Sequence, residues 1–178
     1  MLSRINLQVR YFLVVVFLSA MVAGAQQAPS AAPAPVPPVL LNAKKVFISN
    51  AGSDSGLFPH PFSGDPDRAY SQFYATVQSW GRYDLVPDPS LADVVFELQL
   101  TAPNGPANAN KQNGASDPLP MFRLTIFDRK THYVLWALTE SIDGAALQKT
   151  HDHNFDEALA NLTQDLQTLI NWQPPKGH

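Results

Sequence analysis

The chain has 178 residues, of which 45% are hydrophobic and 15% charged, and it contains no cysteine. Its formal net charge of −3 argues against a nucleic-acid partner or an anionic membrane surface, because both require a basic face. The missing cysteine excludes disulfides, thiolate metal sites and cysteine nucleophiles, and we therefore also expect no lipid anchor of the bacterial lipoprotein type.

The N-terminal segment has the three parts of a secretory signal peptide. Arg4 and Arg10 supply a basic start, residues 11–22 are apolar, and residues 23–25 read Ala-Gly-Ala, which is a small-residue cleavage signal. The apolar run is shorter than the roughly 20 residues that span a bilayer. We therefore expect cleavage after Ala25, no transmembrane span in the remaining chain, and a periplasmic or secreted protein.

Composition divides the rest of the chain. Residues 26–41 are rich in proline and alanine, which predicts a disordered linker with polyproline II character. Residues 42–172 are expected to form a single α+β domain, and residues 173–178 a short tail. Within the domain, residues 102–118 are rich in Asn, Gly, Pro and Ala and have no apolar period, which predicts a mobile loop.

The first half of the domain shows a strand and a helix. Residues 45–49 place Val46 and Ile48 on one face, which predicts a short strand. Asp65 and the following proline are typical of a helix start, with the aspartate as N-cap, and Gly81 is expected to end that helix. The apolar stripe of the helix comprises Tyr70, Phe73, Val77 and Trp80.

Four further strands are expected, at residues 82–86, 93–101, 121–127 and 133–142. The second of them alternates without interruption between apolar and polar residues, which indicates a half-buried strand. A turn over residues 128–131 joins the last two into a hairpin. In the final strand the apolar face is expected to carry Val134, Trp136 and Leu138.

A second helix is expected to begin at Asn154, because Asn154 and Glu157 have the spacing of a capping box. Its apolar stripe comprises Phe155, Leu159, Leu162, Leu166 and Leu169. The order β-α-β-β-β-β-α predicts an α+β fold with a mixed, mostly antiparallel sheet of about five strands and two helices packed on one face.

Three segments of this pattern resemble those of known bacterial envelope domains. They are residues 80–86 (WGRYDLV), residues 91–95 (LADVV) before a strand, and residues 122–128 (FRLTIFD) before a strand with a central Trp136. Over roughly residues 44–170 the chain resembles the N-terminal domain of TolB, the curli-secretion protein CsgG and several families of uncharacterised exported proteins and lipoproteins. The resemblance implies a binding or assembly role at the cell envelope.

No group of polar residues has the spacing that a catalytic mechanism requires, so we expect a non-catalytic module without a cofactor that binds an envelope protein. The candidate partner-binding residues lie on the polar side of the sheet and in the 102–118 loop. They are Glu97, Gln99, Asn104, Asn108, Lys111 and Arg123.

The alternative is a metal- or small-ligand-binding periplasmic protein, or a hydrolase, that uses His151, His153 and Asp156, with His60 approaching them in space. The two histidines are two positions apart, so they do not share a face of a strand or of a helix. The same polar residues are also typical of a helix N-terminus.

Overall fold

The structure, a computed structural model, describes residues 34–107, 109–110 and 116–172. The chain divides into two units, residues 1–34 and 35–178, and the helices and strands given below belong to the second. The expected signal peptide, residues 26–33 of the linker, Asn108, Lys111 and the C-terminal tail lie outside the described residues.

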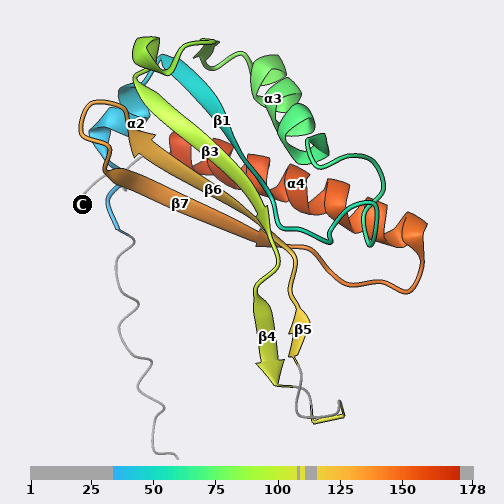
Figure 1. Ribbon diagram of the computed structural model, residues 1–178. Helices are drawn as coiled ribbons and strands as arrows, with labels where there is room; N and C mark the ends of the chain where they lie inside the picture. The colour runs from blue at the N-terminus through green and yellow to red at the C-terminus, as the bar shows by residue number, and fades with distance from the viewer. Residues whose placement is uncertain (1–33, 108, 111–115, 173–178) are drawn as a thin grey trace, which may run out of the picture. The chain divides into compact units, whose positions relative to one another are not determined.

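Five strands form the main sheet, in the spatial order β2-β1-β3-β6-β7 (Figure 1). β1 is parallel to both β2 and β3, whereas β6 is antiparallel to both β3 and β7. The strands are β1 (Lys45–Ser53), β2 (Asp84–Leu85), β3 (Val94–Thr101), β6 (Met121–Asp128) and β7 (Val134–Ser141). Along the whole of β3, buried side chains alternate with half-exposed ones, as its sequence predicts.

Two long helices, α3 (Arg68–Trp80) and α4 (Gln148–Ile170), lie on the same face of this sheet (Figure 1). α3 connects β1 to its parallel neighbour β2, and α4 follows β7. The predicted α+β fold class, with a mixed five-stranded sheet and two helices on one face, is therefore confirmed. In the described part of the chain, none of the helices has both the length and the apolar character needed to cross a membrane.

The core lies between the sheet and these helices, and phenylalanines are its largest side chains. The ring centroid of Phe155 is 5.0 Å from that of Phe122 and 5.1 Å from that of Phe62, so α4, β6 and the segment before α3 meet at one point. Burying such large apolar side chains contributes about 1.5–3 kcal/mol each. The largest fully buried side chains are Phe62, Phe73, Phe96, Phe122, Phe155, Leu40, Leu98, Leu100, Leu124, Ile126, Leu162 and Leu166.

Two aspartates fasten β1 to β3. The Asp93 carboxylate accepts hydrogen bonds from the backbone N–H groups of Lys45 and Lys44, at 3.0 and 2.9 Å, and these bonds lower its pKa. At the other end, the Asp54 carboxylate accepts from Ala102 N at 2.7 Å and from the Thr101 hydroxyl at 2.8 Å, with the same effect on its pKa. Both ends of the parallel β1–β3 pair are therefore fixed.

Two segments that the sequence predicted to be irregular form regular secondary structure. Pro38–Asn42, which includes part of the predicted linker, forms the short helix α2, and Leu40 of α2 is fully buried in the core. Within the predicted loop at residues 102–118, β4 (Asn104–Ala107) pairs antiparallel with β5 (Ser116–Pro118). This pair continues from β3 and β6, whose adjacent positions give β4 and β5 their pairing (Figure 1).

The predicted starts of the two long helices are displaced. α3 begins at Arg68, and the Asp65 carboxylate instead accepts from Asp67 N at 2.8 Å in a turn just before the helix. α4 begins at Gln148, six residues before Asn154, so the predicted capping box is wrong. The side chain of Asn154 donates to the Asp143 carbonyl at 2.9 Å. The added turns form because their polar side chains bind the segment before α3, as shown below.

The predicted apolar face of the last strand is wrong for Val134. Trp136 pairs with the buried Ile126, and Leu138 pairs with the buried Leu124, so both face the helices. The register shifts between Ile126 and Phe127, and Val134 pairs with Phe127 instead. This β-bulge turns Val134 to the other face of the sheet, where it is 56% exposed.

Tyr83 provides a test of the core. It is 6% exposed, its ring packs edge-on against Phe96 at 5.5 Å, and burial raises its pKa to about 12. Its hydroxyl is buried and has no hydrogen-bond partner among the described residues. Because a buried unsatisfied hydroxyl costs free energy, we expect Tyr83→Phe to raise the free energy of unfolding by about 1 kcal/mol, measured by urea denaturation. A loss of stability would contradict this description of the hydroxyl.

Candidate functional site

The face of the sheet opposite α3 and α4, called the open face below, carries half of the predicted partner-binding residues. Gln99 of β3 is directly opposite Arg123 of β6, and Glu97 is opposite Thr125 in the next pair. Arg123 is exposed, and the other three side chains are half-exposed. The register therefore gathers Glu97, Gln99 and Arg123 into one polar patch.

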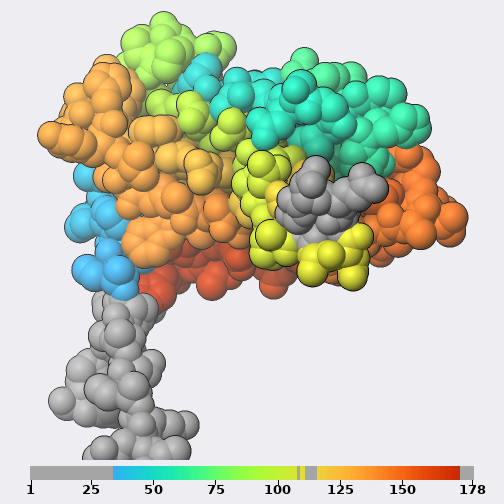
Figure 2. Space-filling view, turned by 60° about the horizontal axis from the view of Figure 1, so that its bottom comes forward, coloured from blue at the N-terminus to red at the C-terminus, as the bar shows by residue number. Residues whose placement is uncertain are grey.

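An apolar row lies next to this patch on the open face. Val95 is paired with Phe47 of β1 and with Phe127 of β6, and Phe127 is paired with Val134 of β7. The apolar row, Phe47-Val95-Phe127-Val134, thus crosses four strands. In Figure 2 the orange surface around β6 and β7 is open to solvent between the blue segment at α2 and the yellow-green segment of β3.

A hollow of about 470 Å³ lies at the apolar row. Its lining combines an apolar floor with a rim of charged and polar groups, and η1, a 3-10 helix (Pro89–Leu91), forms one wall. The lining residues are Pro89, Ser90, Val95, Glu97, Phe127, Asp128, Arg129 and His132. Leu91 and Tyr133, which neighbour lining residues in the sequence, are 55% and 74% exposed.

The turn that forms the other wall is held in a fixed shape. Asp128 Oδ1 accepts from Lys130 N at 2.7 Å, and the Asp128 carbonyl accepts from His132 N at 2.8 Å. His132 has φ 60, in the left-handed region that few residues other than glycine adopt. The Nε of Arg129 is buried and has no hydrogen-bond partner in the described chain. The hollow therefore has a preformed wall.

Of the remaining predicted partner-binding residues, Asn104 lies in β4, away from the polar patch in sequence and in a separate two-stranded sheet. Asn108 and Lys111 lie outside the described residues. The structure therefore groups three of the six predicted residues and leaves Asn104 apart from them.

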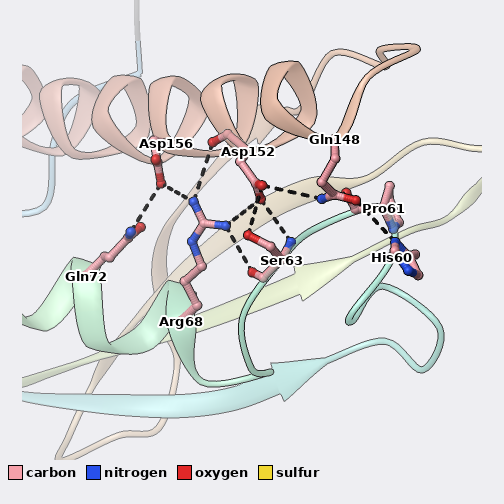
Figure 3. A network of polar contacts seen from close by, with 8 residues as sticks. All are labelled: His60, Pro61, Ser63, Arg68, Gln72, Gln148, Asp152 and Asp156. Carbon is pink, nitrogen blue, oxygen red and sulfur yellow. Dashed lines mark hydrogen bonds and ion pairs between the residues drawn. The ribbon is translucent and has the colours of Figure 1, made fainter.

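The most connected polar cluster is centred on Arg68, at the start of α3 (Figure 3). Arg68 Nη1 donates to Asp152 Oδ1 at 2.7 Å, and Nη2 donates to Asp156 Oδ1 at 2.7 Å. The guanidinium also lies over the Phe155 ring, 4.3 Å from its centroid. One arginine thus joins α3 to two successive turns of α4.

The same cluster fixes the segment before α3. Ser63 donates to the Asp152 carboxylate from its backbone N–H at 2.9 Å and from its hydroxyl at 2.8 Å. Gln148 Nε2 donates to the Pro61 carbonyl at 2.6 Å, and Gln148 Oε1 lies 3.2 Å from His60 Nδ1. The Ser63 N–H contributes most to lowering the pKa of Asp152, with Arg68 acting in the same direction. Asp152 is therefore held ionised by structural partners.

The residues of the predicted metal or hydrolytic site are not grouped. His151 packs edge-on against Phe62 at 6.2 Å, whereas His153 Nε2 lies 3.8 Å from Glu157 Oε2 and its side chain is 74% exposed. Asp156 binds Arg68 and also accepts from Gln72 Nε2 at 3.1 Å. Among the described residues, no group of three or more His, Asp and Glu side chains could hold a metal ion.

The role of Arg68 was not predicted. Its partners carry a signal in the sequence, because Gln148, Asp152 and Asp156 are spaced by four residues and share one face of a helix. That spacing is meaningful only if the helix begins before Asn154. The misplaced helix start therefore hid the cluster.

Comparison with known proteins gives similarities to solved structures alone. No family model and no curated protein matches the chain. A dodecameric PelC from Paraburkholderia phytofirmans shares 18% identity, with 70% of this chain and 87% of that chain covered and a TM-score of 0.42. Protein XCC0632 from Xanthomonas campestris shares 13% identity, with 72% and 84% covered and a TM-score of 0.42.

A third solved structure, uncharacterised lipoprotein B from Nitrosomonas europaea, shares 11% identity, with 72% of this chain and 80% of that chain covered and a TM-score of 0.34. At these identities and scores, the three structures assign this chain neither a family nor a function.

The Arg68 cluster predicts a specific pH dependence. The pKa of Asp152 is lowered in the folded state, so its contribution to stability is present above the unfolded value near 4 and is lost as pH falls below it. We expect Asp152→Asn to lower the free energy of unfolding by about 1–2 kcal/mol at pH 7, and the difference from wild type to shrink between pH 4 and pH 2. Urea denaturation of both proteins at pH 7, pH 4 and pH 2 measures this difference in the free energy of unfolding. A difference that stays constant over this range would contradict the assignment.

Proposed function

We propose that this protein is an exported, non-catalytic module of the bacterial cell envelope that binds a protein partner through its open face. The observation that carries the proposal is the cross-strand register. It places Glu97, Gln99 and Arg123 beside the apolar row, on a face that neither α3 nor α4 covers.

The chemistry of the open face fits a protein surface. Its apolar row supplies a strip that loses contact with water on binding, and its polar patch supplies hydrogen-bond donors and acceptors of both charges. Protein interfaces combine an apolar centre with a polar rim in this way. The hollow at the apolar row adds a recess for one partner side chain, with Arg129 in its lining.

The Arg68 cluster has the groups best suited to catalysis, but these groups are already paired with one another in contacts that hold the fold together. Asp152 and Asp156 are both paired with Arg68, and Asp152 accepts further bonds from Ser63 and Gln148. A carboxylate whose pKa is lowered by such partners is a poor general acid or base near neutral pH. This supports a binding role over the hydrolytic alternative.

One feature of the sequence supports an envelope location, and a second is compatible with it. The signal-peptide pattern of the first 25 residues predicts export. The fold also requires no disulfide, because the chain has no cysteine and its stability rests on the buried core. Such a domain is compatible with an oxidising compartment.

The test is crosslinking of the tagged full chain in its native host, followed by mass spectrometry. We expect Arg123→Glu to reduce the yield of the crosslinked partner at least tenfold, because it reverses a charge at the centre of the polar patch. Lys149→Glu, which makes the same charge change at an exposed position of α4, is the matched control and is expected to leave the yield unchanged. An equal yield from wild type and Arg123→Glu would contradict the proposed surface.

A further inference from the structure

β7 is an edge of the main sheet, and one side of its backbone is unpaired. In the described chain it pairs with β6 alone. Ile142 N donates to the Pro120 carbonyl at 2.8 Å, which makes this a hydrogen-bonded pair of the β6–β7 ladder. Since such pairs alternate along an antiparallel ladder, the N–H and C=O groups of Ala137, Thr139 and Ser141 point outward.

The outward edge of β7 lacks the usual protection against strand pairing. Natural edge strands are blunted by lysine, proline, bulges or short length. β7 has eight residues without lysine or proline, and its bulge is confined to the Val134 end. Its single ionisable side chain, Glu140, is turned toward α4, where it accepts from Asn161 Nδ2 at 3.3 Å.

The opposite side of the sheet is better protected. β2, the strand at that edge, is two residues long. The longer β1 beside it changes register between Asn50 and Ser53, and the Asn50 side chain donates to Asp67 Oδ1 at 2.8 Å. β7 is therefore the longest regular edge of this sheet.

We propose that β7 pairs antiparallel with β7 of a second copy of this chain, which continues the sheet across a twofold axis. The contact uses the outward backbone edge of β7, which borders the open face because Thr139 is paired with Arg123. Its readout is self-association of the purified chain, which is distinct from the partner crosslinking that tests the open face. The side chains at the outward positions are alanine, threonine and serine, all exposed and small enough for a second strand to approach. Thr139 and Ser141 line a hollow of about 360 Å³ beside α4, which shows that this edge is accessible.

The charges at the two ends of β7 favour a second copy in the antiparallel orientation. The turn before β7 carries Arg129 and Lys130, whereas the other end carries Glu140 and Asp143, with Glu157 of α4 lining the same hollow. Asp128 lies in the basic turn, but its carboxylate already accepts from Lys130 N and Thr131 N. Antiparallel pairing of two copies brings the basic end of each beside the acidic end of the other, and parallel pairing would bring like charges together.

The test is sedimentation velocity of the purified full chain over a concentration series. One pair of strands is a small contact, so we expect a reversible dimer with a dissociation constant in the micromolar range. Thr139→Pro removes an outward N–H without removing a bond to β6, and we expect it to weaken dimerisation at least tenfold. Thr139→Val keeps that N–H at nearly the same side-chain volume and is the matched control, for which dimerisation is expected to be unchanged.

The orientation has its own test. We expect Lys130→Glu to weaken the dimer and the double variant Lys130→Glu, Asp143→Lys to restore it. Circular dichroism and the thermal midpoint establish that each variant is folded, and Ala137→Lys, a charged edge substitution, replaces Thr139→Pro if that variant does not fold.

Two outcomes would overturn the proposal. One is a wild-type monomer at every concentration, and another is a dimer that survives both Thr139→Pro and Ala137→Lys. If the wild type is a monomer and its crosslinked partner in the host is lost with Thr139→Pro but kept with Arg123→Glu, β7 pairs with a strand of another protein instead. Loss of the crosslinked partner with Arg123→Glu alone supports binding through the open face and does not change the conclusion on dimerisation drawn from sedimentation.

Discussion

Burial on only one side of the sheet determines the rest of this structure. Val94, Phe96, Leu98 and Leu100 of β3 face the helices and are at most 2% exposed, whereas the residues between them are half-exposed. Both long helices are needed on the same side, because the apolar faces of β3 and β6 are buried there together. The stability of the domain therefore comes from one face, and the other face and the β7 edge remain free to bind.

The Arg68 cluster closes the helical side at the end where α4 begins. α4 would otherwise start with two turns whose residues are mostly polar, and such a segment has little intrinsic reason to be helical. Ion pairs from Asp152 and Asp156 to Arg68, together with the bonds from Gln148, anchor these turns to the segment before α3. The Arg68 cluster contains carboxylates, an arginine and a neighbouring histidine, and so resembles a reactive site in composition. Its groups, however, are paired with one another and stabilise the fold.

Periodicity in the sequence was sufficient for the elements that lie over the core. The alternation in β3 and β6 and the apolar stripe of α3 depend only on which residues are buried, so the fold class could be predicted. Features that depend on contacts between residues far apart in the sequence could not be predicted. The early start of α4 requires knowledge of Arg68, the helix α2 forms because Leu40 enters the core, and β4 pairs with β5 because β3 and β6 bring them together. Likewise, the sequence placed Glu97, Gln99 and Arg123 on the polar face of their strands. The apolar row could not be predicted, because it depends on the register and on the bulge that turns Val134 outward.

Covalent oxidation footprinting in the living host, compared with the purified protein, tests most directly whether the side of the sheet away from the helices is the bound side. The chain has reporters on both sides: Phe127 and Met121 on the open face, with the exposed Tyr133 next to His132 of the hollow, and Tyr70 and Tyr74 on α3. We expect the first three to be protected from oxidation in the host and the two α3 tyrosines to be labelled equally in both samples. Protection at Tyr70 and Tyr74 with none at Tyr133 and Phe127 would contradict a free open face that serves as the binding surface.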